Sequence, residues 1–125
     1  MKKIISTTAA PAAIGAYSQA VLVGEMLYTS GQIPLNPQTM EIESDDVVVQ
    51  TKQVMENVKA VLTGAGATME NVVKCTVFIA DMNDFAKVNE VYATYFTENP
   101  PARSCVEVSR LPRDVKVEVE CIAKL

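Results

Sequence analysis

The first third of the chain places short apolar segments between turn residues, which predicts three β-strands. Residues 2–6 form the first of them. The segments 20–23 and 26–30 flank Gly24-Glu25, which is the pattern of a β-hairpin. Residues 31–37 contain one glycine and two prolines, so a loop is expected to follow the hairpin.

In the middle of the chain the apolar residues recur at steps of three and four, which predicts a helix. Ser44-Asp45-Asp46 offers its N-cap and acidic first turn, while Gly64 and Gly66 end it. Residues 72–80 then form a nearly continuous apolar run, which suits a central, buried strand. The buried stripe of the helix is expected to contain Val47, Val54, Met55, Val58, Val61, Leu62 and Ala65.

A second helix is predicted after the central strand. Asp81 or Asn83 is expected to cap it, and Asn99-Pro100-Pro101 is expected to stop it, because proline neither continues a helix nor favours one before it. Its inner face is expected to carry four apolar positions: Phe85, Val88, Tyr92 and Tyr95 or Phe96.

The last quarter of the chain predicts two more strands, joined into a hairpin by Leu111-Pro112-Arg113-Asp114. Residues alternate across a strand, so the valine-rich faces are expected to pack under the helices. The other face would then carry Arg103, Cys105, Glu118 and Glu120. Arginine–carboxylate pairs across the hairpin are geometrically reasonable. The pattern leaves open whether water or a second subunit covers this charged face.

The predicted element order is β-ββ-α-β-α-ββ. Residues 1–125 are expected to form one domain, because that length is typical of a single hydrophobic core. Two helices and six strands in this order favour an α+β sandwich, with both helices packed on one face of a six-stranded mixed sheet. The apolar content of 49% and charged content of 21% are ordinary for such a fold.

Composition excludes several classes of function. The chain has no histidine, which excludes Ser-His-Asp and Cys-His catalysis as normally built and removes the commonest metal ligand. A carboxylate-only Mg²⁺ or Ca²⁺ site stays open, but no EF-hand-like spacing is present, so no metal site is expected. A net charge of −4 without a Lys/Arg run argues against nucleic-acid binding. The three cysteines form no CxxC pair and no apolar signal segment is visible, so a cytoplasmic protein without membrane association is expected.

Three motifs, in this order along the chain, resemble the RidA (YjgF) family. They are Gly15-Ala16-Tyr17-Ser18-Gln19-Ala20, then Thr29-Ser30-Gly31-Gln32-Ile33-Pro34, and finally Pro101-Ala102-Arg103-Ser104-Cys105-Val106-Glu107-Val108 with Leu111-Pro112-Arg113-Asp114-Val115. The resemblance implies a chorismate-mutase-like fold, a homotrimer and clefts between subunits. It also implies 2-iminobutanoate/2-iminopropanoate deaminase activity without metal or cofactor, in which reactive imines from PLP-dependent dehydratases become 2-oxo acids and ammonia.

The resemblance also implies roles for individual residues. Arg103 matches the arginine that binds the substrate carboxylate, and Glu118 matches the glutamate that handles the attacking water. Cys105 matches a position that contributes mainly backbone contacts. The remaining pocket-lining positions are Tyr17, Ser30, Gly31 and Asn89. The chain departs from the family pattern at Ala16, where proline is usual, and in a short stretch before Pro101.

These residue types suit the implied chemistry. A protonated imine is already a strong electrophile, so its hydrolysis needs a carboxylate clamp, a positioned water and a proton route. Arg103 can supply the first and Glu118 the others. Ser30 has no base beside it, which favours a hydrogen-bonding role, while Gly31 could simply form a turn and Asn89 a polar core contact. A non-catalytic regulatory trimer and an endoribonuclease remain alternative functions.

Overall fold

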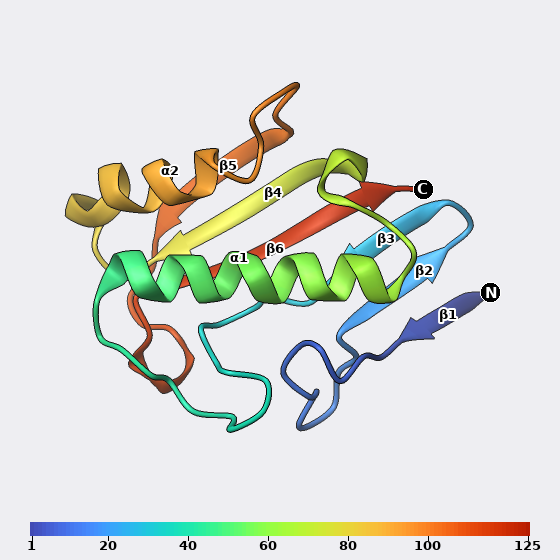
Figure 1. Ribbon diagram of the computed structural model, residues 1–125, viewed down its shortest axis with the longest axis horizontal. Coiled ribbons are helices and arrows are strands. Elements are labelled where there is room, and N and C mark those ends of the chain that lie inside the picture. Colours follow the sequence, from blue (N-terminus) through green and yellow to red (C-terminus); the bar gives the residue numbers. More distant parts are fainter.

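The computed structural model describes all 125 residues as a six-stranded sheet with both helices on one face (Figure 1). The strand order across the sheet is β1-β2-β3-β6-β4-β5. The element order and the α+β class predicted from the sequence are confirmed. The elements are β1 Lys2–Ile5, β2 Ala20–Val23, β3 Met26–Thr29, α1 Val47–Gly64, β4 Val72–Ile79, α2 Phe85–Ala93, β5 Ala102–Glu107 and β6 Val117–Lys124, with short 3₁₀ turns η1 Met69–Asn71, η2 Met82–Asp84 and η3 Pro112–Asp114.

Helix α1 forms where its sequence predicts, but its first turn holds no acidic residue, and Ala65 follows the last helical residue as the C-cap and does not belong to the buried face. The Asp46 side chain accepts hydrogen bonds from the backbone N–H groups of Val48 at 2.7 Å and Val49 at 3.4 Å, which caps the N-terminus. Beyond the C-terminus, Gly66 adopts a φ of +82°, which a residue with a side chain rarely adopts. The buried face contains Val47, Gln50, Thr51, Val54, Met55, Asn57, Val58, Val61 and Leu62. In Figure 1, α1 crosses in front of β6.

Helix α2 is shorter than predicted. The Asp81 side chain accepts a hydrogen bond from the Asn83 N–H, but this caps the η2 turn, and α2 itself begins only at Phe85. The helix ends at Ala93, well before the two prolines. Tyr95 and Phe96 therefore lie beyond its end, although both still pack against the core.

The predicted hairpin of the last two strands is wrong. Strand β4 lies between β5 and β6, so these two strands are not neighbours. Strand β5 runs parallel to β4 because α2 connects them as a crossover, whereas β6 runs antiparallel to both β3 and β4. No arginine–carboxylate pair can therefore form across a hairpin.

The predicted charged face is also wrong, because β5 is turned over relative to the expectation. Arg103 lies opposite Cys75 in the β4–β5 ladder, and this parity places it with Cys105 on the helix-covered face. Glu118 lies opposite Phe78 in the β4–β6 ladder, and with Glu120 it lies on the uncovered face. The sheet therefore separates Arg103 from Glu118 within one chain.

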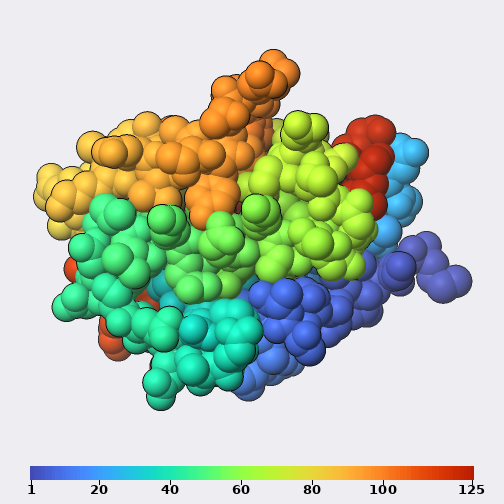
Figure 2. All heavy atoms as spheres, viewed as in Figure 1, coloured from blue at the N-terminus to red at the C-terminus, as the bar shows by residue number.

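The uncovered face of the sheet carries apolar side chains beside charged ones. The ladder pairings place Ile4, Val21, Tyr28, Phe78, Val106 and Ile122 on it. Three of these side chains are strongly exposed: Ile4 at 51%, Tyr28 at 43% and Val106 at 42%. The helices and the loops around α1 cover the opposite face (Figure 2). Neither helix is long and apolar enough to cross a membrane.

Candidate active site

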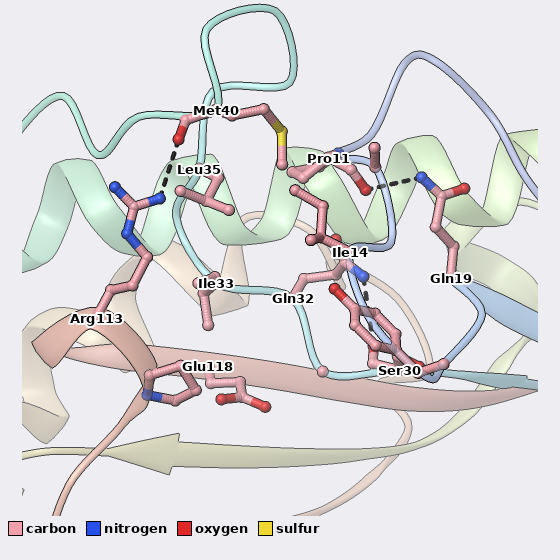
Figure 3. A pocket seen from close by; sticks show the side chains of 14 residues that line it. Pro11, Ile14, Gln19, Ser30, Gln32, Ile33, Leu35, Met40, Arg113 and Glu118 are labelled. Atoms are coloured by element: carbon pink, nitrogen blue, oxygen red, sulfur yellow. Dashed lines mark hydrogen bonds between the residues drawn. The ribbon is translucent and has the colours of Figure 1, made fainter.

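A cavity of about 630 Å³ opens beside the N-terminal half of β6 (Figure 3). Glu118 projects into it from β6, and segments before and after the β2–β3 hairpin form most of the wall. In Figure 3, Arg113 lies at one end of the cavity, while Gln19 and Ser30 lie at the other. The lining residues are Pro11, Ala12, Ile14, Tyr17, Gln19, Ser30, Gly31, Gln32, Ile33, Leu35, Met40, Pro112, Arg113 and Glu118.

The Glu118 carboxyl lies directly against the backbone of Gly31. A Cβ atom added to Gly31 would overlap Glu118 Oε2 and would lie 2.8 Å from Cδ. The glycine is therefore required for close approach and not for a left-handed turn, since its φ is not in that region. Burial raises the pKa of Glu118 above its usual range, and the neighbouring Glu120 carboxylate raises it further. Glu118 takes part in neither ion pair of the chain.

Buried amide side chains hold the loops that form the cavity wall. Gln19 accepts from Thr7 N–H at 2.7 Å and donates to Pro11 O at 2.8 Å, which fixes the segment carrying Pro11 and Ile14. Asn57 of α1 donates to the carbonyls of Ile33 and Leu35 at 3.0 and 2.9 Å. Such fully partnered buried amides rigidify what they hold.

Ser30 and Tyr17 occupy different parts of this wall. The Ser30 hydroxyl donates to Ser18 O at 2.6 Å, so its proton is already engaged. Tyr17 is 53% exposed at the cavity margin. Ala16, at the position where proline is usual, is exposed beside Gly15, whose φ is +118°.

Arg103 forms a second cluster on the other side of the sheet. Its Nη1 donates to Asn89 Oδ1 of α2 at 2.6 Å, and its guanidinium lies over the rings of Phe85 and Tyr92. Like Glu118, it belongs to neither ion pair of the chain. An arginine without a carboxylate partner is free to bind an external anion.

Cys105 belongs to this cluster, and its surroundings disfavour the reactive thiolate form. It is half-buried and packs against the core, and burial raises its pKa although the nearby Arg103 opposes that shift. A raised pKa leaves less of the nucleophilic thiolate. All three cysteines of the chain are free thiols.

Known proteins of similar sequence identify the family. Residues 7–125 match the family described as Endoribonuclease L-PSP. The 2-iminobutanoate/2-iminopropanoate deaminase of Escherichia coli strain K12 is 55% identical, with 98% of each chain covered. The chain belongs to the RidA/YjgF family.

Solved RidA/YjgF structures share the whole fold. The YjgF gene product of E. coli has a TM-score of 0.93 at 54% identity, with 98% of both chains covered. E. coli TdcF, solved with bound serine, has a TM-score of 0.94 at 52% identity and the same coverage. A RutC family protein from Pyrococcus horikoshii is 56% identical over 98% of each chain. The family resemblance seen in the motifs is therefore confirmed.

Within this RidA-family chain, the residues predicted for the site fall into two half-sites. Tyr17, Ser30, Gly31 and Glu118 line the cavity, whereas Asn89, Arg103 and Cys105 form the cluster under α2. Sequence reasoning missed the amides that hold the cavity wall. Asn57 carried a signal, because it is a polar residue between apolar positions on the buried face of a helix. Gln19 lies in the first of the three motifs, but the sequence indicated no role for it.

Proposed function

We propose that the chain hydrolyses 2-imino acids, such as 2-iminobutanoate and 2-iminopropanoate, to 2-oxo acids and ammonia. The observation that carries this proposal is a pair of opposite charges, Arg103 and Glu118, that have no ion-pair partner in their own chain. A 2-imino acid offers a carboxylate to the first and an electrophilic carbon to a water held by the second. The 55% identical E. coli deaminase supports this substrate class.

The two half-sites lie on opposite faces of the sheet, so we propose that neighbouring copies of the chain complete each active site. The exposed apolar side chains on the uncovered face offer the contact surface, since exposed apolar patches on small proteins mark interaction sites. Two different surfaces meeting head to tail generate a closed ring. The family resemblance makes that ring a homotrimer, in which Arg103 of one copy faces Glu118 of the next.

In the proposed reaction, water adds to the C=N carbon and the C–N bond then breaks. Glu118 accepts a proton from the water as the new C–O bond forms, and it returns this proton to nitrogen. It then takes the proton of the new hydroxyl as the C–N bond breaks, so that the C=O bond of the 2-oxo acid forms and ammonia leaves. Arg103 holds the carboxylate throughout. The protonated imine needs no further polarisation, so the proposal includes no metal and no cofactor. A cytoplasmic location stays a prediction.

The test couples threonine dehydratase, which releases the imine, to the purified protein. We expect 2-oxobutanoate and ammonia to form faster than by spontaneous hydrolysis. Binding of 2-oxobutanoate without faster ammonia release would instead support a regulatory trimer. Ribonuclease activity that disappears in Arg103→Ala would support the endoribonuclease alternative. Sedimentation should give three times the chain mass of 13.5 kDa, and a monomer would contradict the shared site.

The pKa of Glu118 is raised in the single chain, which predicts a pH dependence of the activity; the Arg103 of a neighbouring copy would oppose this shift in the proposed trimer. Glu118 must be ionised to accept a proton, so activity should fall as pH drops through its pKa. Glu120→Gln removes the like charge, so the pKa of Glu118 should fall and activity should persist to lower pH. Carbon-13 NMR titration of the Glu118 carboxyl, assigned by its loss in Glu118→Gln, measures this directly.

The raised pKa of Glu118 affects folding stability in the opposite direction to activity, because it favours the folded state at low pH. The folded-state pKa lies above the unfolded one, so protonated Glu118 favours folding below the unfolded pKa, and this contribution is lost as pH rises through the folded pKa. Glu90→Gln removes one exposed carboxylate elsewhere and serves as the control. An unchanged Glu118 titration in Glu120→Gln would contradict the coupling.

A further inference from the structure

The Arg103 guanidinium is held by more than its hydrogen bond to Asn89. Its Cζ lies 5.4 Å from the ring centroid of Phe85 and 5.0 Å from that of Tyr92, both within the range of a cation–π contact. We refer to Phe85 and Tyr92 as the aromatic pair. Figure 1 shows α2, which carries both rings, running beside β5, which carries the arginine.

The contacts come from one face of α2. Phe85, Asn89 and Tyr92 are spaced by four and three residues, which aligns them along one stripe of the helix. The two rings lie against the guanidinium, while the side-chain oxygen of Asn89 accepts a hydrogen bond from Nη1. An arginine has five N–H donors, so four stay available for a carboxylate.

The ring of Tyr92, and not its hydroxyl, makes this contact. Tyr92 is 5% exposed, and its ring packs on Phe96 with centroids 4.9 Å apart. Its buried hydroxyl has no hydrogen-bond partner of acceptable geometry. Burial raises the pKa of this hydroxyl, and the nearby Cys75 thiol raises it further. Replacing the hydroxyl by hydrogen should therefore cost nothing, because no bond is lost.

We propose that Phe85 and Tyr92 are positioning residues that hold the Arg103 guanidinium in the plane in which it binds the substrate carboxylate. This rests on the proposed function. Arg103 extends from an edge strand and is exposed in the single chain, so without the rings its flexible side chain would lose rotamer freedom on binding. Contact with the two rings restricts the Arg103 side chain before the substrate arrives, so less rotamer freedom is lost on binding.

The test compares Tyr92→Leu and Phe85→Leu with Tyr92→Phe, which keeps the ring. Because the carboxylate is held equally before and during reaction, the leucine variants should raise KM by about 2- to 30-fold while kcat changes little. Tyr92→Phe should match the wild type. The Nε–Hε NMR signal of Arg103 should be shifted by the rings in the wild type and in Tyr92→Phe, and should lose that shift in Tyr92→Leu.

Each outcome bears on the proposal. Tyr92→Phe as impaired as Tyr92→Leu would overturn it, as would a folded Tyr92→Leu with unchanged KM and an unchanged Arg103 signal. If Tyr92→Leu does not fold, the half-buried Phe85→Leu provides the same comparison. If the wild type hydrolyses no imine, the NMR signal still tests the positioning. If Arg103→Ala is inactive but the leucine variants are normal, the function stands and the role of the rings fails.

Discussion

Arg103→Ala should reduce kcat/KM for 2-iminobutanoate by roughly 30-fold to several thousand-fold, because removing one member of a desolvated charge pair costs about 2–5 kcal/mol. The fold should survive, since Arg103 is exposed in the chain and its one side-chain hydrogen bond there is to Asn89. The dehydratase-coupled assay measures the activity, while circular dichroism and sedimentation report on folding and assembly.

Two further variants separate charge from geometry. Arg103→Lys keeps the charge but loses the planar fork that binds a carboxylate through two donors, so an intermediate activity is expected. Lys87→Ala removes an exposed cation from α2 and should leave turnover unchanged. An Arg103→Ala variant with wild-type turnover would contradict the carboxylate-binding role.

Glu118→Gln should lower kcat by about 10²- to 10⁴-fold with KM nearly unchanged, which is the usual size of a lost general acid–base contribution. The amide keeps the shape of the side chain but cannot accept the proton of the water. Steady-state kinetics on imine freshly released by the dehydratase distinguishes the two parameters.

Gly31→Ala provides a geometric counterpart to this substitution. The added Cβ would push the Glu118 carboxyl away without removing it, and the Gly31 backbone can accept a side chain because its φ is not left-handed. A large loss of kcat with a nearly unchanged melting temperature is expected.

Glu120→Gln should leave kcat at neutral pH close to the wild-type value. Loss in Glu120→Gln but none in Glu118→Gln would show that the wrong carboxylate was assigned.

The elements that formed as predicted are those whose pattern is local. Gly24 adopts a φ of +61° and turns the β2–β3 hairpin, and Asp46 caps α1 through its own side chain. Both features depend on residues a few positions apart. The length of α2 was predicted less well, because Tyr95 and Phe96 extend the apolar spacing beyond the last helical residue.

The sequence contained a signal against the predicted hairpin of the last two strands. A strand, a helix and a strand in succession favour a parallel crossover, and β4, α2 and β5 form one. The apolar pattern was misleading for β5, because its Val106 faces away from the helices and is 42% exposed in the single chain. Under the proposed trimer another copy of the chain would cover that face.

Patterns along the chain were enough to establish the local elements, the α+β class, the family motifs and the residue types available for chemistry. The position of β6 between β3 and β4, and the placement of Arg103 and Glu118 on opposite faces of the sheet, became known from the folded chain. Alternation along a strand shows which residues share a face, whereas the neighbours of the strand and the layer above that face depend on contacts between residues far apart in the chain.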